Sequence, residues 1–473
     1  MCNFGTFHRA AAPIVVLALS SITLGAASPD RRVADAAQAK NWTAVAALIK
    51  QRADVNVPQP DGATALQWAA HWDQLDVVTT LLKSRANVNA ANELGVTALQ
   101  LACENGSVQV ASALLAAGAD PNAANQAGET ALMTASESGN IEVVKALLAK
   151  GANPNAKERT QDQTALMWAA AEKHPPVIRA LLDAGADLKA RSKGGSTPLL
   201  FAARSGNIDS VRMLLDAGAD PNEAMPDGYT ALLIAAGSGH GEVGVLLLDR
   251  GADPNAATKD EGLTALHALI LKRPLHSTGW KRPANHILLA KALIAHGANL
   301  NLQTAKAVTS MGINVTGTIW QGSTAIVLAA RVADLDMLQI LVDAKADARI
   351  MTANKTTSVM AAAGVGRAEG NEDPIAETDA LSAVKMLTML GVDVNAADTA
   401  GNTALHGAVN NGYNAIIQFL FEQGADLNAT DKEGWTPLNV AEIYRNNFRE
   451  HKESAALLRQ LGAKESTPPP SSR

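Results

Sequence analysis

The chain of 473 residues is poor in aromatic side chains, in cysteine and in charge. Aromatic residues make up 3% of it and apolar residues 47%, so its core must be built from aliphatic and small side chains. Its two cysteines, Cys2 and Cys103, offer no disulfide framework. Charged residues make up 18%, the net charge is -6, and no block of like charge occurs. We therefore expect no sequence-independent binding of nucleic acid, which needs many basic side chains.

The amino-terminal segment has the three-part layout of a secretory signal. The first nine residues hold no acid and end on His8 and Arg9, an apolar run follows over residues 10–24, and small residues then lead to Ala27. We predict a signal peptide over residues 1–27 and an exported chain, periplasmic or secreted. The run is shorter than the roughly 20 residues that a membrane-spanning helix needs, and no later run is longer, so no span is expected after the signal is removed.

Internal repetition dominates the rest of the sequence. A phrase of the form Thr-Ala-Leu-x-x-Ala recurs mostly every 33 or 34 residues, and a second phrase, Gly-Ala-Asp-x-Asn, closes most units. The two phrases predict about twelve units over residues 31–464. The Ser/Pro-rich composition of residues 465–473 predicts a disordered tail. The threonines of the first phrase are Thr64, Thr97, Thr130, Thr164, Thr197, Thr230, Thr264, Thr324, Thr357, Thr403 and Thr436.

Each unit predicts two short helices. After Thr130, apolar residues recur at helical spacing, residues 139–140 interrupt the pattern, and residues 141–148 carry a second apolar stripe. The threonine hydroxyl is expected to cap the first helix, and Gly151 to end the second. One such pair cannot bury both of its apolar faces alone, so the units are expected to stack into one continuous core.

The 33-residue period and the two phrases resemble ankyrin repeats. The resemblance implies an all-α ankyrin-repeat solenoid of about twelve helix-turn-helix units joined by hairpin loops. It also implies a non-catalytic scaffold without a cofactor that binds a partner protein through the concave face of the array. Similar exported arrays look bacterial. The partner is not named by the sequence, and a monomer is expected. The sequence departs from the family's Thr-Pro-Leu-His phrase, whose proline survives only at Pro198 and Pro437.

Three insertions interrupt the period, near residues 272–283, 302–321 and 364–377. The first is basic and carries Trp280, the second has the composition of a longer β finger, and the third is acidic. Insertions in a solenoid map to one face and often lie on the binding surface. Surface loops are also tolerated at little entropic cost, so a recognition role and a neutral one both stay open.

Candidate contact residues lie at inter-helix turns and at the tips of the hairpins, which in the family face the concave groove. Trp68 and Trp168 fall on first helices and are interpreted as semi-buried packing, with partner contact as the alternative. Tryptophan and arginine are enriched among residues that dominate binding energy. The predicted partner-binding residues are Trp72, Glu137, Ser138, Arg204, Tyr229, Trp280, Trp320, Asn410, Asn411 and Trp435.

No catalytic or metal-binding constellation is evident. Most histidines occupy fixed offsets in separate repeats, and the ten-residue spacing of His276, His286 and His296 is not typical of zinc sites. Cys103 takes a position that most units give to alanine, so it is predicted to be a buried apolar side chain. Two alternatives stay open: an enzyme or small-ligand binder with a pocket at the insertions around residues 272–321, and a secreted host-directed or immunity-type binding factor.

Overall fold

The computed structural model describes residues 30–271, 284–307, 321–366, 375–442 and 451–465. Over these ranges the chain forms α-helices and a few isolated β-bridges but no strand, which confirms the predicted all-α class. None of the helices in these ranges has both the length and the apolar character that a membrane crossing requires. Contacts divide the chain into two units, residues 1–220 and residues 221–473, and each is described by itself.

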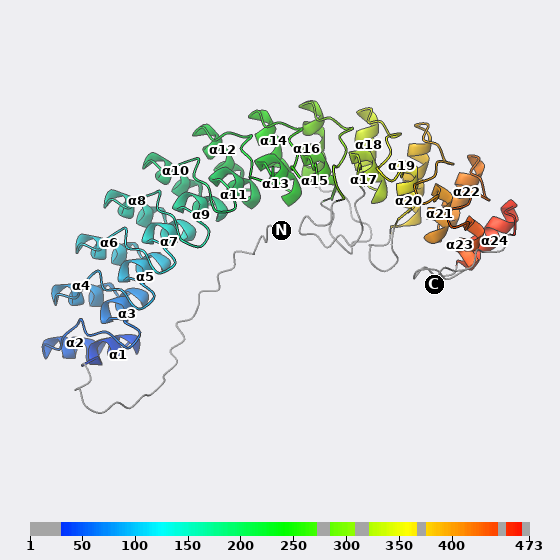
Figure 1. The fold of residues 1–473 in the computed structure, drawn as a ribbon. Coiled ribbons are helices and arrows are strands. Elements are labelled where there is room, and N and C mark those ends of the chain that lie inside the picture. Colours follow the sequence, from blue (N-terminus) through cyan, green and yellow to red (C-terminus); the bar gives the residue numbers. More distant parts are fainter. Residues whose placement is uncertain (1–29, 272–283, 308–320, 367–374, 443–450, 466–473) are drawn as a thin grey trace. The chain divides into compact units, whose positions relative to one another are not determined.

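The first unit is a stack of helix pairs, and each pair contributes one helix to each of two rows (Figure 1). Helices pack against their neighbours within a row and against their partner across the rows. The first row holds α1 (Arg32–Gln38), α3 (Ala65–His71), α5 (Ala98–Glu104), α7 (Ala131–Ser138), α9 (Ala165–Ala171) and α11 (Pro198–Ser205). The second row holds α2 (Trp42–Lys50), α4 (Leu75–Lys83), α6 (Val108–Ala116), α8 (Ile141–Ala149), α10 (Pro175–Asp183) and α12 (Ile208–Asp216).

The second unit repeats this two-row arrangement. Its first row holds α13 (Ala231–Ser238), α15 (Ala265–Leu271), α17 (Ala325–Arg331), α19 (Ser358–Ala362), α21 (Ala404–Asn410) and α23 (Pro437–Glu442). Its second row holds α14 (Gly241–Asp249), α16 (Ala284–Ala295), α18 (Leu335–Asp343), α20 (Glu377–Thr388), α22 (Asn414–Glu422) and α24 (Lys452–Leu461).

The repeated threonine starts first-row helices, as predicted. Thr97 is extended at the N-cap of α5, and its hydroxyl accepts a hydrogen bond from the backbone N of Gln100 at 3.3 Å. The Gln100 side chain accepts in turn from the backbone N of Thr97 and donates to the carbonyl of Glu129 in the next unit. The same side chain therefore caps its own helix and links two repeats. The cap is not universal, because the hydroxyls of Thr164 and Thr197 make no such bond.

At most junctions, the asparagine that closes the Gly-Ala-Asp-x-Asn phrase joins its helix pair to the next. Asn122 Nδ2 donates to the carbonyl of Gly151 at 2.9 Å, and Asn122 Oδ1 accepts from the backbone N of Asn153 at 2.7 Å. Equivalent pairs of bonds are made by Asn56, Asn89, Asn155, Asn222, Asn255 and Asn395. This role between repeats was not predicted from the sequence.

Successive hairpin loops are joined by a single backbone hydrogen bond at a constant position. In the first unit, the backbone N of Gln126 donates to the carbonyl of Leu94 at 2.8 Å, and the backbone N of Arg159 donates to that of Ala127 at 2.7 Å. In the second unit, Lys432 donates to Ala400 at 2.9 Å in the same way. Each loop is thus held by its neighbour as well as by its own turn.

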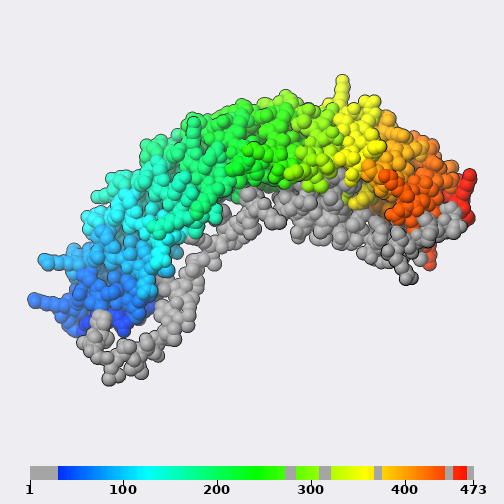
Figure 2. Space-filling view, in the orientation of Figure 1, coloured from blue at the N-terminus to red at the C-terminus, as the bar shows by residue number. Residues whose placement is uncertain are grey.

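The core lies between the two rows. Its aliphatic side chains, such as Leu147 and Leu214, are fully buried, as a core without many aromatic residues requires. Cys103 is also fully buried, as predicted, and burial raises the pKa of its thiol to about 12. On the face shown in Figure 2, the side chains of successive pairs in the first unit form an unbroken surface.

Truncation of this core tests the packing. We expect Leu147→Ala to lower the free energy of unfolding by about 2–5 kcal/mol, because it removes buried apolar surface and leaves a cavity. Leu94→Ala is the matched control, since Leu94 lies in a hairpin loop and is 61% exposed. It should change stability by less than about 0.5 kcal/mol. Urea unfolding followed by circular dichroism measures both, and equal effects of the two substitutions would contradict the assigned core.

A buried histidine predicts how stability depends on pH. His267 lies in the first turn of α15, where other units have Gln67 or Gln100, and burial lowers its pKa to about 4. The unfolded chain takes up this proton near pH 6.5, so the stabilising contribution is complete above that pH and is lost as the pH falls toward 4. Lowering the pH from about 7 to about 5 should therefore reduce the free energy of unfolding by roughly 2 kcal/mol through His267 alone. His267→Gln introduces the residue that caps the equivalent helix in other units, and it should flatten this pH dependence of the free energy of unfolding. Urea unfolding at a series of pH values measures this, and the same pH profile in the variant would contradict the role of His267.

Candidate functional site

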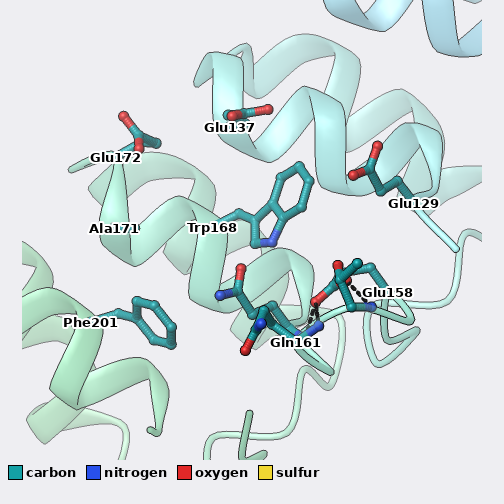
Figure 3. Close-up of a pocket in the computed structure, with 10 residues that line it drawn as sticks. Glu129, Glu137, Glu158, Gln161, Trp168, Ala171, Glu172 and Phe201 are labelled. Atoms are coloured by element: carbon teal, nitrogen blue, oxygen red, sulfur yellow. Dashed lines mark hydrogen bonds between the residues drawn. The ribbon is translucent and has the colours of Figure 1, made fainter. Parts of the chain in front are cut away.

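A pocket opens in the first unit between α7, α9, α11 and the hairpin loops that precede α7 and α9 (Figure 3). Four of its ten lining residues are glutamates, and none is Lys, Arg or His. The lining residues are Glu129, Glu137, Glu158, Thr160, Gln161, Gln163, Trp168, Ala171, Glu172 and Phe201. The pocket is therefore acidic, with aromatic rings among its walls.

The loop that forms one wall is folded around the carboxylate of Glu158. Its oxygens accept hydrogen bonds from the backbone N of Thr160 at 2.6 Å, of Gln161 at 2.8 Å and of Gln163 at 2.9 Å, and from the Thr160 hydroxyl. Burial by itself would raise the pKa of Glu158, but these hydrogen bonds outweigh it and hold the pKa below its ordinary value. Glu158 thus places a permanent negative charge in the wall of the pocket at neutral pH.

Trp168 stands at the centre of the pocket. Figure 3 shows its indole with Glu137 and Glu172 to one side and Glu158 and Gln161 to the other. The residue is half-buried, and its Nε1 is shielded from solvent without a hydrogen-bond partner in the described residues. Phe201, on the neighbouring helix α11, supplies a second aromatic ring.

The turn that carries Glu137 is fixed by the next repeat. Gly139 ends α7 with a φ of 74°, and a Cβ at this position would lie 2.5 Å from the ring of His174. His174 Nε2 donates to the carbonyl of Glu137 at 3.0 Å. Only glycine fits here without strain, so the close approach of His174 holds this turn in place.

The arrangement suits a cationic, planar group better than a metal ion. Carboxylates attract positive charge, and the face of an indole attracts cations at close range. In the part of the chain that the structure describes, no group of three or more His, Cys, Asp or Glu residues could hold a metal.

The predicted contact residues have differing surroundings. Glu137 and Ser138 are exposed at the end of α7, and Glu137 lines the pocket. Arg204, Tyr229 and Asn410 are half-buried. Glu137 is thus the one predicted contact residue that the structure brings into the pocket, while the other residues of the pocket were not predicted as contacts.

The prediction that Trp435 is an exposed contact residue at a hairpin tip is wrong, because only 5% of Trp435 is exposed. It immediately precedes the helix-capping Thr436, and the equivalent residues Ala63, Glu129 and Leu263 are buried as well. Trp435 closes its hairpin: its carbonyl accepts from the backbone N of Asp431 at 3.0 Å, and its backbone N donates to the Asp431 carboxylate at 2.9 Å.

Trp72 and Asn411 are less available for contact with a partner than their turn positions suggested. Trp72 is half-buried, stacks on Trp68 with ring centroids 6.4 Å apart, and has the Lys40 Nζ 3.6 Å from its ring centroid. Asn411 Nδ2 donates to the carbonyls of Gly364 and Gly407. The amide of Asn411 is therefore used in holding the fold together.

Several predictions fall outside the described residues. They are Trp280, Trp320, the insertion at 272–283 and most of those at 302–321 and 364–377. His286 is described and is buried in α16. The alternative pocket at the insertions therefore stays a prediction.

One feature of the sequence could have pointed to the pocket residues that were not predicted. The interval from Thr130 to Thr164 is 34 residues rather than 33, and the added residue lies in the hairpin loop closed by Glu158 and Gln163. The shorter loop before α7 is closed by Asn125 and Glu129. A longer, polar loop beside a first-row tryptophan is thus visible in the sequence once the period is counted.

Comparison with known proteins shows the family. A family model described as ankyrin repeats in three copies matches residues 33–92, 86–158, 157–225 and 199–304, and a second model, of many copies, matches residues 386–441. These matches cover more than half of the chain, which therefore belongs to the ankyrin-repeat family. Ankyrin repeats are generally modules for protein–protein interaction. The number of about twelve units stays a prediction, since the matches leave part of the chain uncovered.

Individual relatives are similar over short stretches only. An ankyrin repeat protein of Acanthamoeba polyphaga mimivirus, L271, is 41% identical over 68 residues, which are 14% of this chain and 9% of that protein. The potassium channel AKT1 of Arabidopsis thaliana is 36% identical over 85 residues, or 18% of this chain and 9% of the channel. The matched stretches thus span about a tenth of these relatives. The solved ankyrin repeat domain of human ASB11 is 27% identical, with a TM-score of 0.42, covering 47% of this chain and 98% of that domain.

Proposed function

We propose that this protein is a non-catalytic scaffold that binds a partner protein through the face formed by its first-row helix ends and hairpin loops. The observation that supports the proposal most is the acidic, aromatic pocket at α7, α9 and α11, which opens among these elements. The core packs between the two rows, so the outer turns and loops of the first row are the parts free to vary with the partner.

The hydrogen bonds between repeats favour binding by a preformed surface. The loop that carries Glu158 is held by its own carboxylate and by the bond from Arg159 N to the carbonyl of Ala127. A surface that is already ordered loses little conformational entropy when a partner arrives. We therefore expect contacts at residues 137–138 and at the loop over residues 158–163 to form without a large change in the backbone.

We also propose that the protein is exported, with the signal over residues 1–27 removed, and that its partner is met in the periplasm or outside the cell. The support is the order of basic, apolar and small residues in that segment. A host-directed or immunity-type role would differ from this proposal only in the place where the partner is found.

Site-directed photocrosslinking of the exported protein tests the proposed face. A photoreactive residue at Ser138, which is exposed on the first row, should give a discrete crosslink to one partner protein, identified by mass spectrometry. The same group at Gln109, exposed on the second-row helix α6, is the control and should give none. Equal yields at both positions, or no crosslink at either, would contradict the proposed face. The mass of the exported chain's amino terminus shows in the same sample whether cleavage follows Ala27.

A further inference from the structure

The pocket around Trp168 holds polar groups that the fold itself does not use. The side-chain amide of Gln163 has no hydrogen-bond partner among the described residues, although Gln163 is only 6% exposed. In the preceding unit the equivalent residue, Glu129, is bonded to Asn125. The carboxylate of Glu172 likewise makes no hydrogen bond or ion pair to the part of the chain that the structure describes. Both side chains are therefore available to a ligand that presents hydrogen-bond donors.

The charge of the pocket specifies the sign of that ligand. No lining residue is basic, Glu172 has no ion pair in the part of the chain that the structure describes, and Glu158 is held in its ionised form by the loop. A positively charged group that enters would meet carboxylates on both sides of the indole.

The shape and chemistry of the walls distinguish between cations. Trp168 and Phe201 offer flat apolar faces, while Glu172 and Gln163 offer oxygen acceptors among the same lining residues. A guanidinium group is planar, stacks on aromatic rings and presents five donors in a fixed fork, whereas an ammonium group is compact and strongly hydrated. The combination of aromatic rings and more than one acceptor therefore fits arginine better than lysine.

We propose that this pocket receives an arginine side chain from the partner protein, with the guanidinium stacked on Trp168 and paired with Glu172 and the amide of Gln163. The inference rests on the proposed function, since it names the feature that the scaffold recognises. It makes the Trp168 pocket a specificity-determining site, at which a partner segment that carries arginine is preferred over one that does not.

Calorimetric titration of the full-length protein with short peptides tests the proposal. The probe is acetyl-Gly-Ser-Arg-Ser-Gly-amide, compared with the same peptide carrying lysine or citrulline, which has nearly the shape of arginine without its charge. We expect binding of the arginine peptide, with an affinity at least about tenfold higher than that of the citrulline peptide and higher than that of the lysine peptide. Equal affinities for arginine and citrulline, or no binding up to about 10 mM peptide, would overturn the proposal.

Variants distinguish binding of the peptide in the pocket from nonspecific attraction of a cationic peptide to acidic residues elsewhere on the protein. Glu137→Gln combined with Glu172→Gln should weaken the arginine peptide about tenfold, and Trp168→Leu should weaken it too, with the fold checked by circular dichroism. Glu142→Gln is the control, because Glu142 is an exposed second-row residue outside the pocket and should leave the affinity unchanged. If Glu142→Gln weakens binding as much as the double variant, the pocket is not the site.

The peptide titration and the photocrosslinking test different claims and can fail separately. If a partner is crosslinked at Ser138 but the peptides do not discriminate, the arginine pocket is wrong and the scaffold stands. If the peptides discriminate but no partner is crosslinked, the pocket stands and the proposed protein-binding face is wrong.

Discussion

Contact between neighbouring helix pairs is the constraint on which the structure depends. A single pair leaves an apolar face uncovered, and only the next pair in the row can cover it. Hydrogen bonds then fix the spacing of the pairs: Asn122 bridges to Gly151 and Asn153, and Gln100 bridges to Glu129. Packing supplies the stability and these polar bridges supply the register, so each repeat is folded because its neighbours are.

The same bridges decide which surface is left for binding. They hold the hairpin loops and the turns after the first-row helices in defined positions, as His174 does for the turn at Gly139. Side chains that project from these positions are then arranged by the period of the repeat. A departure from the period, such as the longer loop at residues 158–163, changes this surface locally without disturbing the core.

The period allowed the helices, the threonine caps and the buried Cys103 to be predicted from the sequence, because each depends on contacts that recur in every unit. Exposure at the hairpins could not be predicted as well. Trp435 is buried because the residue before the capping threonine closes the hairpin, a geometry that composition does not reveal. The pocket escaped prediction for a related reason, since it brings together residues from three helices and two loops, and Trp168 taken alone is typical of packing.

Amide hydrogen exchange at single-residue resolution tests the central claim most directly. The backbone N–H groups of Asp120, Asn153 and Asp187 belong to exposed residues, and each donates to an asparagine of the preceding unit. If repeats hold one another in register, these amides should exchange on the order of 100-fold more slowly than in an unstructured chain, and Asn122→Ala should remove the protection of Asn153 while sparing that of Asp187. Exchange of all three at unstructured rates, or protection of Asn153 that survives the substitution, would contradict the account.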